Sequence, residues 1–434
     1  ETAAMATEQR SSTRLSTQAR SRWPRQLFAG LLLGASFPSL AWKPQPLDLP
    51  DLGAALSPNV VAHPTGGFVL SWQVRLADGC AALRVARLRG RTLGTVHEVV
   101  RGCDWFVNWA DFPGVVIADN GDWLTWWLRK SAPDTYAYDI QVSRSSDGGG
   151  HWSDPVVPHR DGTHSEHGFV SISPLQDDRV LLLWLDGRQM VGAHEHDQGH
   201  GDAGATMLRS AVLDGAGQLH EEQALDERVC DCCGTDLVRV DARRQVAIYR
   251  DRSAEEIRDT GVIERLDGHW QPPTLVHADG WRMPACPVNG PALATQQAQL
   301  LVAWSTMADQ PDLRVRARLL ESEAEPRELE AGPGVLGRVD AVAFGGDWLL
   351  SWLGAGDEGQ AVLRLARLDS ALDERQRWDL RTLPAGRDIG MPRMAASHGE
   401  ALLVWTEVDE TAPRIGTRAA TRLRGLWLGE PPQP

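Results

Sequence analysis

The most regular feature of the chain is a short apolar run that follows a polar or glycine-containing turn and includes an aromatic residue. Seven such runs occur at intervals of about fifty residues, with a slightly longer interval around the fourth. Their aromatic residues are Trp72, Trp126, Trp184, Tyr249, Trp304, Trp352 and Trp405. Self-similarity at a period of this length is typical of folds that repeat one supersecondary unit.

Apolar and polar residues alternate in the segments next to these runs. LRVARL (83–88) and VLRLARL (362–368) each follow a run, and VDAVAF (339–344) precedes one. Alternation with a period of two residues, bounded by Gly, Asp and Pro, predicts half-buried strands, and helical periodicity is nearly absent. Four short strands per repeat predict an all-β fold, a β-propeller of four-stranded blades. Seven runs favour seven blades, and six is the alternative if the first or last unit is only an edge.

The first 41 residues have a different pattern. Four arginines between positions 14 and 25 precede the apolar run LFAGLLLGASFPSLA (27–41), which ends in a small-x-small sequence. A basic region, a short apolar run and such an ending are typical of a secretory signal, and the run is too short for a comfortable membrane span. We therefore expect residues 1–41 to be removed on export. Residues 42–434 would form a single propeller domain that is periplasmic or secreted.

Composition and charge narrow the range of partners. The chain has 434 residues, of which 42% are hydrophobic and 24% charged, and its formal net charge is −14. This composition is that of a globular protein. Nucleic-acid binding needs clustered Lys and Arg that replace phosphate counterions, and the chain has no long basic stripe. We expect a monomer without a nucleic-acid partner.

One turn, SSDGGGHW (145–152), combines a carboxylate, three glycines and a tryptophan. The carboxylate of Asp147 can accept hydrogen bonds from the amides of the turn, and glycine supplies positive φ. Trp152 would pack back onto its blade. Weaker copies of the turn occur at residues 266–273 and 424–431. We expect Asp147 and Trp152 to have a structural role.

This turn matches S-x-D-x-G-x-x-W, the Asp box of sialidases. Through it and the strand pattern, the chain resembles the sialidase superfamily of BNR-repeat β-propellers over roughly residues 55–428. DERVCDCCGTD (226–236), YRDRSAEEIRD (249–259) and ACPVNGPA (285–292) look like segments of uncharacterised exported bacterial sialidase-like proteins. The resemblance implies a propeller whose axial face binds an anionic or glycan ligand.

The resemblance does not extend to the residues that sialidases use for catalysis. Those enzymes need three arginines for the sugar carboxylate, an acid/base aspartate, and a late tyrosine nucleophile activated by a glutamate. The stretch SPNVVAHP (57–64), where the first arginine is expected, contains none, and the last tyrosine is Tyr249. Tyr249 stands at the repeated aromatic position, which predicts packing. Exo-sialidase activity of the usual kind is therefore not expected.

Arginines and acids follow several of the apolar runs and would lie near the central axis. Such a group suits an anionic or sugar ligand, with two carboxylates for acid/base catalysis in any glycoside hydrolysis. The candidate ligand-binding residues are Arg188, Arg250, Arg258 and Arg393, and the candidate catalytic residues are Asp251 and Glu256. The alternative is a salt-bridge network between blades that holds the ring closed.

Six cysteines fall into two groups. Cys80 and Cys103 stand in the first repeat, and export predicts a disulfide between them. The other four are Cys230, Cys232, Cys233 and Cys286. They can form disulfides, one can be a reactive thiol, or three or four thiolates can hold a soft metal ion such as Cu(I) or Zn²⁺, although the spacing matches no zinc ribbon. Cys232 and Cys233 would point to opposite faces of an extended strand.

Histidines form a second candidate metal group. His164 and His167 lie in THSEHG (163–168), and three more, His194, His196 and His200, lie in the following glycine-rich segment. His-x-His with a third histidine can bind copper or zinc, and a solvated loop is the alternative. The leading hypothesis remains an exported sialidase-like propeller that binds an anionic or glycan ligand. The alternatives are a metal-binding propeller that uses the cysteines, and a non-catalytic interaction scaffold.

Overall fold

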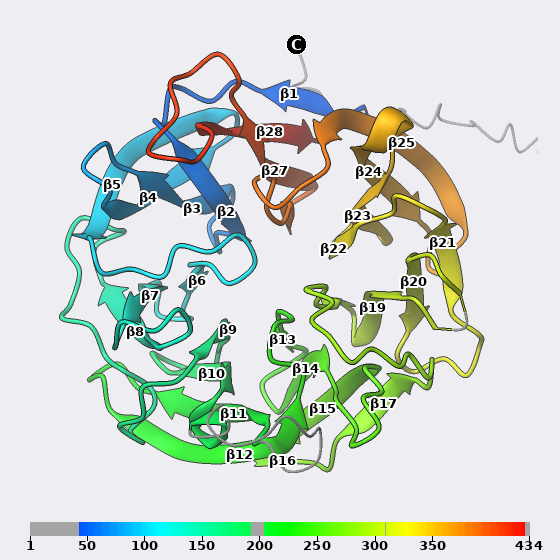
Figure 1. The fold of residues 1–434 in the computed structure, drawn as a ribbon, viewed down its shortest axis with the longest axis horizontal. Coiled ribbons are helices and arrows are strands. Elements are labelled where there is room, and N and C mark those ends of the chain that lie inside the picture. The colour runs from blue at the N-terminus through cyan, green and yellow to red at the C-terminus, as the bar shows by residue number, and fades with distance from the viewer. Residues whose placement is uncertain (1–42, 192–203, 309, 430–434) are drawn as a thin grey trace, which may run out of the picture. The chain divides into compact units, whose positions relative to one another are not determined.

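The computed structural model describes residues 43–191, 204–308 and 310–429. Seven antiparallel sheets stand in a ring around a central axis, and each sheet is one blade of a β-propeller (Figure 1). The first strand of each blade lies innermost. The predicted all-β propeller is confirmed, and the number of blades is seven. Residues 1–41, the predicted signal peptide, lie outside the described residues.

The first three blades contain β2 to β12. Blade 1 consists of β2 (Ala55–Ala62), β3 (Phe68–Arg75), β4 (Ala81–Arg89) and β5 (Thr92–Gly102). Blade 2 consists of β6 (Val115–Ile117), β7 (Trp123–Lys130) and β8 (Tyr138–Ser145), and an isolated bridge between Val142 and Val156 extends its outer edge. Blade 3 consists of β9 (His167–Pro174), β10 (Val180–Asp186), β11 (Thr206–Leu213) and β12 (Leu219–Val229), with a 3-10 turn, η1 (Arg188–Met190), after β10.

The remaining blades complete the ring. Blade 4 has β13 (Asp236–Arg239), β14 (Arg244–Arg250) and β15 (Thr260–Leu266), and both β16 (His269–Trp270) and β17 (Thr274–His277) pair with β15. Blade 5 has β18 (Ala292–Gln296), β19 (Gln299–Thr306), β20 (Arg314–Leu319) and β21 (Arg327–Ala331). Blade 6 has β22 (Gly337–Phe344), β23 (Asp347–Ala355), η2 (Asp357–Gly359), β24 (Gln360–Leu368) and β25 (Glu374–Pro384). Blade 7 has β26 (Arg393–Ser397), β27 (Glu400–Val408) and β28 (Thr421–Leu428).

Blade 7 takes its outermost strand from the other end of the described chain. β1 (Gln45–Leu47) pairs antiparallel with β28, with Gln45 opposite Trp427 and Leu47 opposite Gly425. The hydrogen bonds of this pair join the beginning of the propeller to its end. The ring is therefore closed by main-chain hydrogen bonds as well as by the packing of neighbouring blades.

The repeated aromatic residues form the core between blades. Trp72, Trp184, Trp304 and Trp352 are fully buried, and the other three are at most 7% exposed. Each belongs to a cluster that combines strands of adjacent blades; Trp72, for example, shares one with Leu402 and Trp427 of blade 7. Burying a large aromatic side chain contributes about 2–3 kcal/mol. Each fifty-residue repeat of the sequence thus supplies one large packing residue to its blade.

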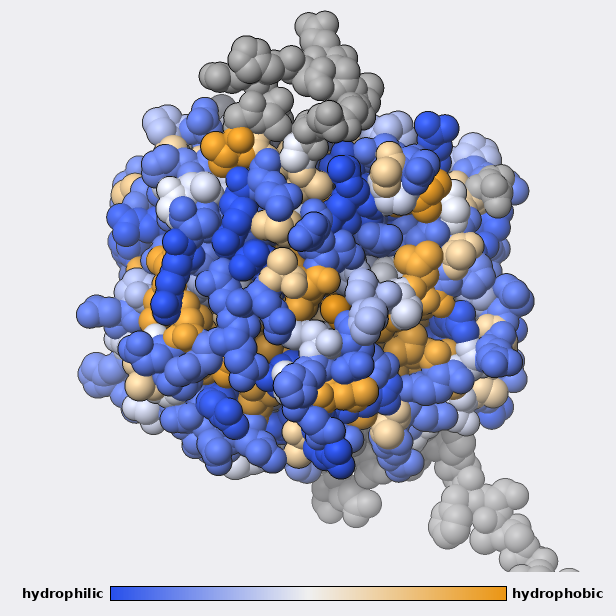
Figure 2. Space-filling model, turned by 90° about the horizontal axis from the view of Figure 1, so that it is seen from below, coloured by the Kyte–Doolittle hydropathy of each residue, from blue (hydrophilic) through white to orange (hydrophobic). Residues whose placement is uncertain are grey.

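The outer edge of the ring is polar. Along β5, β12 and β25 the side chains are mostly exposed or half-buried. Figure 2 shows the side of the molecule as mainly hydrophilic, with apolar residues in small groups. No helix in the described ranges has the length and apolar character that crossing a bilayer requires.

Two local features fix the loops of blades 1 and 2. A disulfide joins Cys80 and Cys103, as predicted. In the turn after β8, the carboxylate of Asp147 accepts hydrogen bonds from the Ser145 hydroxyl and the His151 amide, both at 2.9 Å. The indole of Trp152 donates to the carbonyl of Gly149 and packs against an apolar cluster that contains Val85 of blade 1. In this geometry the turn joins two blades and faces neither of the axial cavities described below.

Candidate functional site

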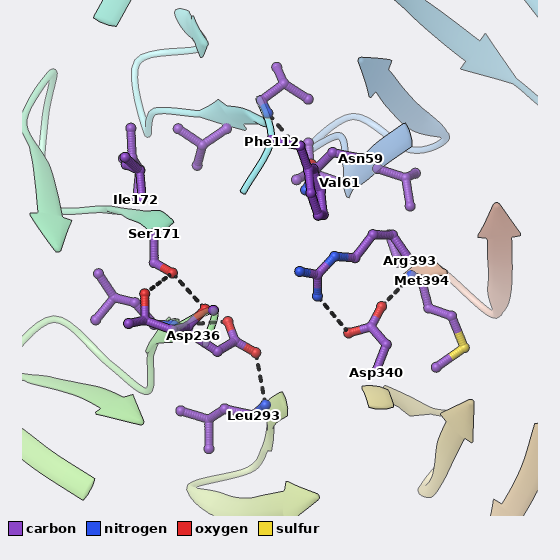
Figure 3. Close-up of a pocket in the computed structure, with 18 of the residues that line it drawn as sticks. Asn59, Val61, Phe112, Ser171, Ile172, Asp236, Leu293, Asp340, Arg393 and Met394 are labelled. Carbon is purple, nitrogen blue, oxygen red and sulfur yellow. Dashed lines mark hydrogen bonds and ion pairs between the residues drawn. The ribbon is translucent and has the colours of Figure 1, made fainter. Parts of the chain in front are cut away.

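The inner strands enclose a small axial channel of about 320 Å³, which residues from all seven blades line (Figure 3). Polar side chains in and beside this channel accept hydrogen bonds from backbone amides of the next blade. The pairs are Asn59 with Val115, Asp111 with Phe169, Asp236 with Leu293, Asn289 with Arg338, and Asp340 with Met394. These side chains satisfy buried amides between blades, so the channel residues mainly hold the ring together.

Arg393, a predicted ligand-binding residue, points into this channel (Figure 3). Its guanidinium lies 3.7 Å from the carboxylate of Asp340 and 5.3 Å from the ring centre of Phe112. Burial raises the pKa of Asp340 to about 6, although the charge of Arg393 acts in the opposite direction. Arg393 therefore partly balances a carboxylate that the channel buries.

A larger cavity of about 810 Å³ shares Asp111 and Phe169 with the channel. Aromatic rings, carboxylates, thiols and one arginine line it. These residues include Phe106, Trp109, Tyr136, Tyr138, Glu166, Asp231, Cys232, Cys286 and Arg387. Tyr136 and Val191, which also line it, are two of the few large apolar side chains that the described residues expose. We call this space the axial cavity.

A tyrosine between two carboxylates forms one wall of the axial cavity. The hydroxyl of Tyr138 lies 2.6 Å from Glu166 and 3.0 Å from Asp111. Burial raises the pKa of Glu166 to about 8 and that of Asp111 to about 7, and it raises the pKa of Tyr138 well above its usual value. Near neutral pH this group holds protons that an ordinary pair of carboxylates would have lost, which suits general-acid chemistry.

Three cysteine sulfurs converge beside the same cavity. Residues 230–233 follow β12 as a turn, which brings the Sγ of Cys230 within 3.3 Å of Cys233 and 3.7 Å of Cys232. Cys232 and Cys233 were expected to point to opposite faces of an extended strand. The segment is a turn instead, so that expectation does not apply. The Sγ of Cys286 lies 3.6 Å from Asp231, and these two side chains and Cys232 have ligand atoms within 4.8 Å of one another. All four cysteines are free.

The electrostatics of the cysteine group favour a thiolate at Cys230. Burial raises the pKa of the Cys230 thiol, but hydrogen bonds from Cys232 and Cys233 and the charge of Arg258 outweigh burial, and the pKa falls well below its usual value. The pKa values of Cys232 and Cys233 rise, because hydrogen bonding to Cys230 and burial favour their protonated forms. Arg258, a predicted ligand-binding residue, is buried beside Cys230.

Arg250, predicted to bind ligand, is buried instead among backbone carbonyls. Its guanidinium donates four hydrogen bonds, two to Asn289 and one each to Arg258 and Ser305, at 2.7–3.0 Å. It also lies over the ring of Trp281 at 4.9 Å. Arg250 lines neither the channel nor the axial cavity.

The predicted catalytic carboxylates, Asp251 and Glu256, do not line the axial cavity. Glu256 forms ion pairs with Arg252 at 2.7 Å and Arg258 at 2.8 Å, and these bonds lower its pKa against the effect of burial. Burial raises the pKa of Asp251 to about 6. The carboxylates that do line the cavity are those of Asp111, Glu166 and Asp231, together with Asp134 on an exposed turn. Sequence reasoning missed Glu166 because no apolar run precedes it.

Arg188 belongs to a group of histidines and aspartates in blade 3. It forms an ion pair with Asp186 at 2.7 Å and lies 3.3 Å from Asp161. Asp161 in turn lies 3.2 Å from Nε2 of His167, one of the predicted metal ligands. His164 lines the axial cavity, whereas His194, His196 and His200 lie outside the described residues. The four predicted arginines lie in blades 3, 4 and 7 and pair with different groups.

Comparisons with known proteins locate the chain at the level of fold. No protein-family model and no curated protein sequence matches it. Among solved structures, it is similar to a Hadza microbial sialidase (13% identity, 69% of this chain and 63% of that chain, TM-score 0.43). It is similar to an α-L-arabinanase from Penicillium chrysogenum complexed with arabinobiose (12%, 87% and 93%, 0.45). It is also similar to an α-L-arabinofuranosidase from Fusarium graminearum with arabinobiose (11%, 75% and 94%, 0.48).

These three solved structures share no more than 13% identity with the chain, and their TM-scores are at most 0.48. The likeness is one of fold. At such identities it assigns no residue a role, so the function has to be argued from the side chains of this chain.

Proposed function

We propose that this protein is an exported metal-binding β-propeller in which Cys230, Cys232 and Cys233 hold a soft metal ion beside the axial cavity. The observation that carries the proposal is the convergence of three free thiols, whose sulfurs all lie within 4.8 Å of one another. Cys80 and Cys103, by contrast, are bonded to each other. That disulfide supports export, because disulfides persist in oxidising compartments.

The spacing of the sulfurs suits a thiolate-bound ion. A tetrahedral ion with metal–sulfur bonds of about 2.3 Å separates its ligands by about 3.8 Å. The observed separations of 3.7 Å and 3.3 Å require only small adjustments. Cys286 or Asp231, both next to Cys232, can supply a fourth ligand from the cavity side. Thiolate sulfur selects Cu(I) or Zn²⁺ over harder ions.

Nearby arginines offset the negative charge that such a site gathers. Arg258 lies beside Cys230, and Arg250 acts electrostatically on Cys233. Buried charges are tolerated when opposite charges lie close to them, and several thiolates around one ion carry a net negative charge. The charge of this site can therefore be balanced by arginines of the same chain.

The test is metal stoichiometry measured together with thiol counting. Full-length protein reduced and loaded with Cu(I) or Zn²⁺ should retain about one equivalent of one of these ions after desalting. Cys230→Ser and Cys233→Ser should each lower retention at least tenfold. The paired variant Cys80→Ser/Cys103→Ser, which removes two cysteines elsewhere, should retain the metal fully. Oxidation of all six cysteines in protein purified under native conditions, with no bound metal, would reject the proposal.

A glycan ligand in the axial cavity is the second candidate function. It is favoured by a specific observation: the exposed ring of Tyr136 and the ring of Trp109 line the same cavity as Glu166. Aromatic faces and hydrogen-bonding carboxylates are the usual means of holding a sugar ring. Glu166, held by Tyr138, is then the candidate general acid.

Calorimetry with arabinobiose and a sialyl-oligosaccharide tests this candidate. Tyr136→Ala should weaken binding about tenfold or more, whereas Val96→Ala, an exposed apolar residue on β5, should leave binding unchanged. If any hydrolysis is measurable, Glu166→Gln should abolish it with little change in binding. Absence of binding to either sugar at millimolar concentration would count against a glycan function.

A further inference from the structure

A second cluster of metal-binding side chains lies between blades 2 and 3 and contains no cysteine. His159, on the segment after β8, and His167, the first residue of β9, stack with their rings 3.7 Å apart and an interplanar angle of 2°. Asp139, the second residue of β8, lies beside both rings. Both histidines are buried, and Asp139 reaches the solvent only in part. One nitrogen of each histidine and one oxygen of Asp139 lie within 4.8 Å of one another.

The nitrogen that faces Asp139 is not satisfied by the protein. Nδ1 of His167 is fully buried and makes no hydrogen bond to any described residue. The oxygen of Asp139 lies 3.7 Å from it and 3.9 Å from Nε2 of His159, both too far for a hydrogen bond. A buried polar nitrogen without a partner is costly, and its presence calls for a missing ligand.

We propose that His159, His167 and Asp139 bind a divalent metal ion that prefers nitrogen and oxygen ligands, such as Zn²⁺ or Mn²⁺. Bonds of about 2.0–2.2 Å place neighbouring ligand atoms about 3.0–3.6 Å apart, and the oxygen of Asp139 exceeds this by a few tenths of an ångström, at 3.7 Å from His167 and 3.9 Å from His159. The two parallel rings also have to tilt toward each other so that both lone pairs point at the ion. Imidazole with carboxylate suits these ions, whereas the cysteine group suits softer ones. The amide of Ile140 approaches Nε2 of His159 at 3.3 Å, a long contact that the ion displaces.

The opposite side of the histidine pair fixes the orientation of the rings. An oxygen of Asp161 lies 3.2 Å from Nε2 of His167 and 3.6 Å from Nδ1 of His159, and the guanidinium of Arg188 lies 3.3 Å from the same oxygen. Metal-binding histidines commonly direct their second N–H to a carboxylate, which leaves the first nitrogen free for the ion. Asp161 is in that position for both rings.

Charge explains why the ion belongs on the side of Asp139. On the side of Asp161, Arg188 already binds Asp186 with two short hydrogen bonds of 2.7 Å and lies 3.3 Å from Asp161. A second cation there would meet the guanidinium directly. The three carboxylates therefore divide into two that pair with an arginine and one, Asp139, that is left for a metal.

The site adjoins the wall of the axial cavity. Asp139 follows Tyr138 and His167 follows Glu166, and consecutive side chains of a strand point to opposite faces. The amide of Tyr138 also donates to the carbonyl of Ser165 at 3.1 Å. An ion bound behind this wall fixes the two backbone segments that carry the Tyr138–Glu166 pair. Its role is to position the wall, and it has no direct contact with a ligand in the cavity.

The decisive experiment uses the full chain with Cys230, Cys232 and Cys233 replaced by Ser, so that failure of the cysteine proposal cannot affect the result. Addition of Co²⁺ should give one equivalent of binding with weak visible bands of nitrogen and oxygen ligands and no sulfur charge-transfer band. Zn²⁺ should compete with it and raise Tm by several degrees.

Matched variants assign the site. In the same background, Asp139→Asn and His167→Gln should each weaken Co²⁺ binding at least tenfold, with Tm in chelator within a few degrees of the parent. His220→Gln, which removes an exposed histidine paired with Asp214, should bind as the parent does. Binding that survives both Asp139→Asn and His167→Gln, or no binding in the parent background, would overturn the proposal.

Discussion

Two buried basic side chains in neighbouring blades, Arg250 and His167, differ in how completely their nitrogen atoms are bonded. Arg250 donates four hydrogen bonds to carbonyl oxygens. Nδ1 of His167 has no hydrogen-bond partner in the part of the chain that the structure describes. Burial is equal in the two cases, so burial by itself is a poor sign of function. The missing hydrogen-bond partner of Nδ1 in His167 is a better sign of function.

The largest effect that this comparison predicts is on the stability of the Arg250→Met variant. The substitution leaves carbonyls of Asn289, Arg258 and Ser305 without their donor in the interior. We expect a loss of about 3–5 kcal/mol in the free energy of unfolding, measured by urea denaturation with and without added metal.

Arg243→Met is the matched control, because Arg243 forms an exposed ion pair with Asp267. It should change stability little. If Arg250→Met cost less than about 1 kcal/mol, the guanidinium would not be structural, and the sequence-based prediction that it binds ligand would regain support.

An effect of intermediate size on stability is expected for Asp340, a buried carboxylate that forms only some of its possible hydrogen bonds. Its pKa is about 6 in the folded protein, where burial favours the protonated form, against an ordinary value of 3.8. The folded state therefore binds the proton more tightly than the unfolded state. Stability should fall as the pH rises from about 4 to about 6, by about 3 kcal/mol at most.

Comparison of unfolding free energies for wild type and Asp340→Asn across this pH range isolates the contribution. The difference between the two proteins should change with pH and become constant above about 7. Parallel curves from pH 4 to pH 7 would show that Asp340 is ionised throughout and is fully balanced by Arg393.

The smallest effect is expected for His167→Leu in the presence of a chelator. Because Nδ1 of His167 has no hydrogen bond to lose and the change removes the 3.2 Å contact of Nε2 with Asp161, stability should stay within about 2 kcal/mol of wild type. In the background with Cys230, Cys232 and Cys233 replaced by Ser, Zn²⁺ at a hundredfold excess over its dissociation constant should stabilise the parent by about 2.7 kcal/mol and the His167→Leu variant not at all. A large loss in chelator would make His167 a structural residue like Arg250.

The fold was predictable from the sequence because one packing residue recurs per blade. A tryptophan or tyrosine that fills the space between two blades has to return each time the chain completes a blade, and Trp72 and Trp304 do so in register. The disulfide was predictable for a similar reason: Cys80 and Cys103 belong to one repeat and its neighbouring strands.

The site was less predictable because it depends on contacts between blades and on side-chain direction. Asp139 lies on β8 and His159 on the segment that follows it, and only the path of that segment and the packing of blade 2 against blade 3 bring both to His167. Arg250 ends β14 and was expected to face the axis, but the carbonyls of blade 5 draw it into the interior. The periodicity of the sequence does not predict where the side chain of Arg250 or the side chains around His167 point.

The pairing of β1 with β28 sets an order of assembly. A chain delivered from its N-terminus cannot complete blade 7 until its last strand has arrived, so Gln45–Leu47 must wait without a partner while the other six blades form. Contacts between residues so far apart in the sequence form slowly during folding. If the protein is exported as proposed above, the ring cannot close before the whole sequence has crossed the membrane.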